Sequence, residues 1–157
     1  MAEKYPAALN PADVTPRLAS IYPPQYAKAL AGREKRTLGD TFGLTQYGVN
    51  HATLPPGCWS SQRHWHEKED EFIYVLTGEI TLIDDAGEHL LGAGMCAGFK
   101  AGVANGHHLV NKSNAVATYL EVGSRMDGER ARYSEADMLA EKTPTGWKLT
   151  RKDGSAY

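Results

Sequence analysis

The chain has 157 residues, about the size of one globular domain, with 17 basic and 19 acidic side chains. This near balance excludes a strong electrostatic attraction to nucleic acid or to an anionic membrane, and the apolar runs are too short to span a bilayer. Two cysteines, Cys58 and Cys96, do not imply a disulfide framework, and residues 1–17 lack the apolar stretch of a secretory signal, so we expect a cytoplasmic protein with reduced thiols.

The first 37 residues are rich in proline, which interrupts helices and leaves no N–H group for a central strand. We therefore predict an extended N-terminal arm over residues 1–37. One short helix is expected over 25–31, after a proline pair and before Gly32.

Beyond the arm, glycine-rich turns separate short apolar stretches, and no helical periodicity lies between them. Many short strands at this spacing are typical of an antiparallel sandwich or barrel, so we predict an all-β fold with the barrel over residues 38–125. Cys96 is expected as a small buried residue in one strand. The predicted strands are 45–54, 58–66, 71–76, 79–84, 89–91, 95–99, 107–111 and 115–122.

The last segment, residues 126–157, has a different pattern. Residues 134–141 read as a short C-terminal helical segment with Ser134 as its N-cap, and residues 147–154 read as a short strand with a turn. Large apolar side chains such as Met138 indicate that the segment packs on the barrel as an extension.

A pair of histidines two positions apart, His64 and His66, is the strongest chemical signal in the sequence. Alternate residues of a strand point to one face, so both imidazoles can reach a single ion. Glu71 follows at a distance that a turn can close, and His107 lies on a later predicted strand. Three imidazoles and a carboxylate suit a divalent transition metal such as zinc, iron, manganese or nickel.

Two residues next to proposed ligands, His108 and Asp70, are alternative ligand candidates. His107 shares a strand face with Leu109, whereas His108 points to the other face and is expected to be partly exposed or at an interface. Glu71 is preferred over Asp70 because of its spacing to the following glycine. The alternative, a set of ordinary polar core residues, is disfavoured because unpaired buried polar groups cost about 2–7 kcal/mol each.

The sequence around these residues resembles the two signature segments of the cupin superfamily. Residues 57–78, containing HWHEKEDEFIYVLTG, are similar to the first segment, and residues 92–111, ending in AGVANGHHLVN, are similar to the second. The second segment departs from the usual pattern, with Lys100 where many cupins have proline and a longer interval between Gly102 and His107. The residues of both segments are also similar to those of a group of small bacterial single-domain cupins with no assigned reaction.

The resemblance implies a single antiparallel double-stranded β-helix, the cupin or jelly-roll barrel, with a mononuclear metal site. Four protein ligands would leave one or two positions open for a small polar ligand or substrate. An isomerase, a lyase, a dioxygenase or a hydrolase is compatible with that site. Gln62, Tyr47 and Tyr119 are weak candidates for catalytic side chains, since packing roles are as common for them.

Two other functions remain open, a non-catalytic module that binds or senses a small ligand and a structural metal site. The arm is too short and too rich in proline for a fused DNA-binding bundle. The arm carries aromatic residues that would be poorly covered if it simply lay in solvent. We therefore also predict a homodimer in which the arm packs on the partner's barrel. The alternative is an arm that folds back on its own barrel.

Overall fold

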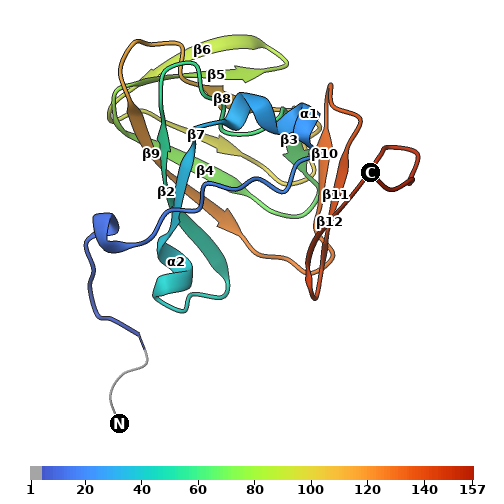
Figure 1. The fold of residues 1–157 in the computed structure, drawn as a ribbon, viewed down its shortest axis with the longest axis horizontal. Helices are drawn as coiled ribbons and strands as arrows, with labels where there is room; N and C mark the ends of the chain where they lie inside the picture. Colours follow the sequence, from blue (N-terminus) through green and yellow to red (C-terminus); the bar gives the residue numbers. More distant parts are fainter. Residues whose placement is uncertain (1–4) are drawn as a thin grey trace.

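The structure is a computed structural model that describes residues 5–157. Within this range it consists mainly of antiparallel strands arranged in three sheets (Figure 1), which confirms the predicted all-β barrel. The largest sheet has the order β1 (Glu34–Thr37), β2 (Tyr47–Leu54), β9 (Ala117–Ser124), β4 (Glu71–Thr77) and β7 (Cys96–Phe99). A three-stranded sheet has the order β6 (Gly87–Gly92), β5 (Glu79–Asp84) and β8 (His108–Val110).

The barrel core lies between these two sheets. Strand β4 shows the underlying alternation, because Ile73 and Val75 are buried while Phe72 and Tyr74 are exposed. The turn after β4 needs Gly78, which has a φ of 75° and whose missing Cβ would lie 2.9 Å from a backbone oxygen. The buried residues of the barrel cluster are Ala52, Leu54, Cys58, Ile73, Val75, Ile80, Leu82, Leu91, Leu109, Ala117 and Tyr119.

The C-terminal residues form most of a third sheet, which stands beside the barrel in Figure 1 and has the order β12 (Gly146–Thr150), β11 (Leu139–Thr143), β10 (Arg130–Tyr133) and β3 (His64–His66). The strand predicted near Trp147 is confirmed as β12. The helical segment predicted over 134–141 is wrong, since residues 134–137 form a bend and Leu139–Thr143 a strand. Pairing of β11 with both β10 and β12 satisfies its backbone and overrides the local helical preference.

A second apolar cluster holds this sheet against the arm. Its buried members come from β10, β11 and the bend between them, and Tyr22, Tyr26 and Leu149 pack against it. The Tyr22 ring meets Tyr133 edge-to-face at 5.6 Å, and Tyr26 meets Tyr157 at 6.4 Å. The cluster's buried residues are Ala131, Tyr133, Ala136, Met138 and Ala140.

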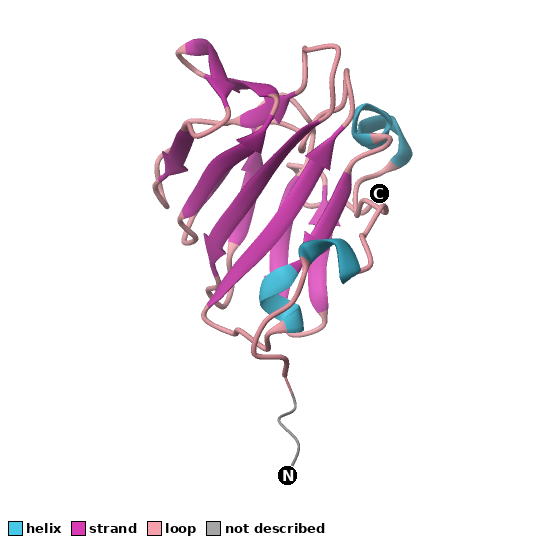
Figure 2. Ribbon diagram, turned by 90° about the vertical axis from the view of Figure 1, so that its left-hand side faces the viewer, coloured by secondary structure: helices cyan, strands magenta, loops and turns pink. Residues whose placement is uncertain are grey.

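The described part of the arm, residues 5–37, contacts both the C-terminal cluster and the barrel of the same chain, and Figure 2 shows the segment beside the N-terminus below the strands. The predicted short helix is confirmed as α1 (Pro24–Ala27) followed by the 3-10 turn η2 (Lys28–Leu30), and a further 3-10 turn, η1, spans Pro11–Asp13. Arg17 bridges to Lys35, and β1 pairs with β2, so the end of the arm joins the barrel sheet. Residues 1–4 of the predicted arm lie outside the described residues.

Two smaller features complete the fold. Cys96 is exposed, contrary to the prediction that it is buried, because its register opposite Tyr74 turns it to the outer face of the sheet; Cys58 is the buried thiol. A short helix that the sequence did not suggest, α2 (Leu38–Thr41), connects β1 to β2. In residues 5–157 no helix is long and apolar enough to cross a bilayer.

Candidate metal centre

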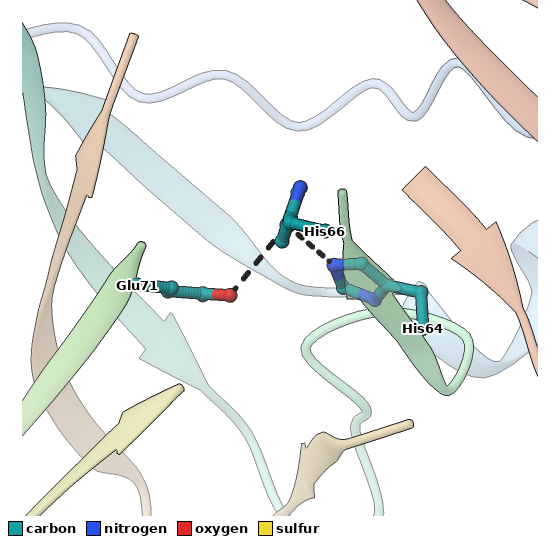
Figure 3. Close-up of side chains that lie close together, drawn as sticks. All are labelled: His64, His66 and Glu71. Carbon is teal, nitrogen blue, oxygen red and sulfur yellow. Dashed lines mark hydrogen bonds and ion pairs between the residues drawn. The ribbon is translucent and has the colours of Figure 1, made fainter. Parts of the chain in front are cut away.

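The candidate ligands come from three elements that the fold brings together. Strand β3 carries His64 and His66 on the same face, and Glu71 is the first residue of β4, after a turn over residues 67–70. His107 lies immediately before β8 and exchanges backbone hydrogen bonds with His64, of 2.9 and 3.1 Å. The side chains of His64, His66 and Glu71 point toward one another (Figure 3).

The ligand atoms of these residues converge within a few ångströms. His64 Nε2 lies 3.1 Å from His66 Nε2, and His66 Nε2 lies 3.7 Å from Glu71 Oε2. The same carboxylate oxygen is 3.0 Å from His107 Nε2. His64, His66 and Glu71 each offer a ligand atom within 4.8 Å of the others, and His107 extends this group on the Glu71 side.

The hydrogen-bond partners of the three Nδ1 atoms indicate which nitrogen of each neutral imidazole carries the proton. The Nδ1 atoms of His64 and His107 lie 2.9 and 3.4 Å from the backbone oxygens of Gln62 and Asn105, which only accept hydrogen bonds. His66 Nδ1 lies 3.2 Å from the carboxylate of Glu129.

With the Nδ1 protons directed at these oxygens, the Nε2 atoms of His64 and His66 present lone pairs 3.1 Å apart. His107 Nε2 faces the Glu71 carboxylate at 3.0 Å and donates to it in the metal-free protein. Two facing imidazole lone pairs beside a carboxylate repel one another unless a cation lies among them, and such a cation would also replace the proton that His107 Nε2 shares with Glu71. This arrangement of donors fits a divalent transition metal.

The environment also keeps His64 neutral. Burial, followed by the positive charge that His66 would carry, lowers the pKa of His64 to about 3. For Glu71, burial would raise the pKa, but the hydrogen bond and charge of His107 outweigh it and bring the pKa down to about 2. A neutral imidazole and an ionised carboxylate are the protonation states that metal ligands require.

Packing orients His107 as well. The ring of Phe99 stacks on the His107 ring with 3.5 Å between centroids and an angle of 2° between planes. His108 is not part of the group of converging ligand atoms, although it lines the cavity beside them. It is buried rather than partly exposed, because its Nδ1 contacts the Ser61 carbonyl at 3.0 Å and its ring packs on Trp59.

A cavity of about 590 Å³ opens beside the four candidate ligands, which all line it. Its polar wall includes Glu121, whose carboxylate accepts hydrogen bonds from Lys35 Nζ at 2.8 Å and Asn50 Nδ2 at 3.0 Å. Tyr119 lies in the same wall, fully buried, and its hydroxyl has no hydrogen-bond partner in the described structure. Burial, helped by the charge of Glu121, raises the pKa of Tyr119 well above its ordinary value, so the phenol stays protonated.

The three weak catalytic candidates are placed differently. Tyr119 lines the cavity, but Gln62 and Tyr47 are not among its lining residues. Gln62 Nε2 instead donates to the backbone oxygen of Tyr26 at 2.8 Å and thereby ties the arm helix to the barrel. Tyr47 is 44% exposed at the start of β2.

Several residues that shape the site were not found from the sequence, and two of them contact candidate ligands directly. Phe99 is one, since an aromatic residue at the end of a strand carries no sign of stacking on a distant histidine. Glu129 is the other, since it follows a turn in a segment with no recognisable motif. Lys35, Asn50 and Glu121 were also missed, although period-two alternation on β9 places Glu121 on the same face as Tyr119.

Comparisons with known proteins agree with this architecture. The sequence profile of the family described as "Cupin domain" matches residues 50–123. A protein from Silicibacter pomeroyi, described as a sugar phosphate isomerase from a cupin superfamily, is 45% identical, with a TM-score of 0.91 and 96% of each chain covered. A comparison with curated proteins gives no match.

Two more distant structures share the fold. A protein from Acidithiobacillus ferrooxidans, whose description as a sugar phosphate isomerase is provisional, is 27% identical with a TM-score of 0.71 and 77% of each chain covered. The polyketide cyclase RemF from Streptomyces resistomycificus is 20% identical with a TM-score of 0.62, covering 74% of this chain and 78% of its own. At that identity the likeness to RemF shows the fold alone.

Proposed function

The chain belongs to the cupin superfamily, and from this premise we propose that it is a metal-dependent enzyme acting on a small polar molecule. In this proposal His64, His66, Glu71 and His107 hold one divalent metal ion. The observation that carries it is the convergence of three imidazole Nε2 atoms and a carboxylate oxygen on the wall of a 590 Å³ cavity. Concave sites of this size with a few convergent polar groups are typical of small-molecule binding.

A bound zinc, iron, manganese or nickel ion would supply Lewis-acid polarisation of a substrate oxygen, or dioxygen chemistry in the case of iron. The chain's own contribution is to bind and orient the substrate beside that position. Tyr119 remains protonated and can donate a hydrogen bond to a substrate oxygen, because its hydroxyl has no other partner in the described structure.

We further propose a sugar phosphate as the substrate and isomerisation as the reaction. The proposal is supported by the description of the 45% identical protein and by the cavity's polar wall. Glu121 and Asn50 offer an acceptor and an amide to sugar hydroxyls, and Lys35 offers a cation. Arg33 lines the same cavity and has a buried Nε with no partner in the described structure, which suits an anionic phosphate.

The experiment is metal analysis of protein purified without a metal-affinity column, followed by assays of each metal-loaded form against a panel of aldose and ketose phosphates. We expect interconversion of at least one pair and its loss after chelation. Keto-acid and catechol panels test lyase and dioxygenase activity in parallel.

Two alternatives have distinct outcomes in the same experiment. A sensing module would bind a panel member tightly with no turnover with any metal. A structural site would show a lower melting temperature on chelation and no ligand binding at all. Either outcome would contradict the isomerase proposal.

We also propose a homodimer in a reducing compartment such as the cytoplasm, where the two free thiols Cys58 and Cys96 stay reduced. Strand β4 leaves Phe72, Tyr74 and Leu76 at least 36% exposed, and a second copy related by a two-fold axis would cover the same residues in both chains. The contacts of the arm with its own chain favour the folded-back alternative for residues 5–37. Light scattering at micromolar concentration tests the dimer, and a monomeric mass would refute it.

A further inference from the structure

Glu129 is a fully buried carboxylate outside both signature segments and outside the stretch matched by the family profile. Burying an ionised carboxylate is costly unless other groups compensate its charge. No lysine or arginine side chain of residues 5–157 forms an ion pair with it. Its compensation comes instead from N–H groups, and one of them belongs to a candidate metal ligand.

The two oxygens of Glu129 accept three hydrogen bonds. Oε1 accepts from the backbone N–H of Glu67 at 3.0 Å and from His66 Nδ1 at 3.2 Å, and Oε2 accepts from the backbone N–H of Lys68 at 2.7 Å. Backbone bonds hold the residue on both sides, because its carbonyl accepts from Lys142 N and the neighbouring Arg130 carbonyl accepts from Glu67 N. Glu129 thus joins β11 to the strand that carries His66.

A second possible reading is a separate metal site, since His66, Glu69 and Glu129 also bring three ligand atoms within 4.8 Å. The hydrogen bonds exclude it as a built site. Both Glu129 oxygens already face N–H groups, and Glu69 accepts from Met126 N at 2.8 Å and from Lys142 Nζ at 3.0 Å. Donors occupy the positions from which a cation would be bound.

We propose that Glu129 is a positioning residue that fixes the tautomer and the ring orientation of His66 for metal binding. By accepting the Nδ1 proton, it leaves the His66 Nε2 lone pair directed at His64 and Glu71. A carboxylate behind a metal-bound imidazole raises the basicity of the ligand and holds its ring, and losing such a partner typically costs about 10–100-fold in metal affinity. The expected effect on metal affinity rests on the proposed metal site. The expected tautomer of His66 does not rest on it, because it concerns the metal-free protein.

The test compares Glu129→Gln with the full-length wild-type protein and with Met138→Ala. Gln places an amide NH₂ against one of the N–H donors and removes the anion. Met138 is 1% exposed in the C-terminal apolar cluster, directly before β11, so its truncation loosens that cluster while the candidate ligands and the hydrogen bonds of Glu129 stay in place. Two measurements are needed, the imidazole ¹⁵N spectrum of the metal-free protein and the zinc affinity by competition with a chelator.

In the wild-type spectrum we expect His66 to carry its proton on Nδ1, and in Glu129→Gln we expect a shift toward the Nε2-protonated form. Zinc affinity should fall about 10–100-fold in Glu129→Gln and by less than about threefold in Met138→Ala, within the scatter of a variant that keeps the ligands and their partners. A wild-type His66 protonated on Nε2, or equal losses in the two variants, would overturn the positioning role. Absence of zinc binding by the wild-type protein would overturn the proposed metal site, and the metal-free spectrum would still decide the role of Glu129.

Discussion

The barrel and the C-terminal sheet each contribute residues to the candidate metal centre, and they are built differently. The barrel cluster has eleven buried residues, mostly aliphatic, from the interior of two sheets. The C-terminal cluster has five, three of them alanine, and depends on Tyr22 and Tyr26 of the arm for further cover. Glu71 belongs to the first region, on a strand with neighbours on both sides, whereas His66 belongs to β3, at the edge of the second.

The comparison shows that two of the four proposed ligands, His64 and His66, depend on the smaller C-terminal cluster for their position. Strand β3 pairs with β10 along its length, while on the other side His64 bridges to His107 and the His66 carbonyl accepts from Gly102 N at 2.8 Å. The candidate ligand atoms converge where the two regions meet, so the C-terminal residues help to position the candidate site.

The largest effect is expected from truncating a buried side chain in either cluster. Leu54→Ala in the barrel and Met138→Ala in the C-terminal sheet should each lower the free energy of unfolding by about 2–5 kcal/mol, since both side chains are at most 1% exposed. Because β3 connects the regions, we expect one cooperative transition in urea by tryptophan fluorescence and by circular dichroism. Two transitions at different urea concentrations would show that the C-terminal sheet unfolds separately.

Removing one ligand from each side should have the next largest effect. His66→Asn and Glu71→Gln should each weaken zinc binding more than about 100-fold, beyond the loss expected for an outer partner. Chelator competition measures this, with Tyr47→Phe as a control because Tyr47 lies outside the cavity. If one of the two ligand variants kept wild-type affinity, the ion would be held by one region alone.

The two regions also differ in how far the sequence predicted them. Period-two alternation and the spacing of His64, His66 and Glu71 were enough to expect the barrel strands and the convergence of these side chains. Metal binding itself stays a prediction. Local signals failed for residues 134–141, where pairing with two distant strands decides the conformation.

Near the site, too, the errors arise because local sequence does not determine contacts with distant strands. Gln62 was a catalytic candidate on the strand predicted over 58–66, but residues 60–63 are bends, so the alternation of β3 does not extend to it. Glu129 reaches His66 across 63 positions of sequence, and no spacing rule connects them. Cys96 was misplaced because the inward and outward positions of a short strand depend on its register with β4.

A smaller effect is expected from acid on the metal-free protein. The pKa of His64 is near 6.5 in an unfolded chain and about 3 in the folded protein, so the unfolded chain binds the extra proton between these values. The stability present above pH 6.5 is therefore lost as the pH falls, by up to about 1.4 kcal/mol per pH unit. Glu71, lowered from 4.5 to about 2, adds a loss of the same sign below pH 4.5.

Urea unfolding at several pH values after chelation measures this dependence. His64→Gln should reduce the slope between pH 6.5 and 4.5, because glutamine does not titrate, while His51 and His108, whose pKa values are also lowered by burial, retain part of it. A wild-type stability that stayed level over that interval would mean that His64 is solvated or already charged in the folded protein.

The smallest effect on stability, and the sharpest contrast between the regions, concerns two buried tyrosines. Tyr119 in the barrel has a hydroxyl without a partner in the described structure, whereas the hydroxyl of Tyr133 in the C-terminal cluster is hydrogen-bonded to Tyr22. Tyr133→Phe should therefore cost about 1 kcal/mol, the typical net value of one such bond, while Tyr119→Phe should be neutral or stabilising. If Tyr119 donates to a substrate oxygen as proposed, the same Tyr119→Phe change should lower kcat/KM for a sugar phosphate about tenfold or more. Equal losses of stability in both variants would show that the Tyr119 hydroxyl has a partner within the fold, and its availability to a ligand would then be refuted.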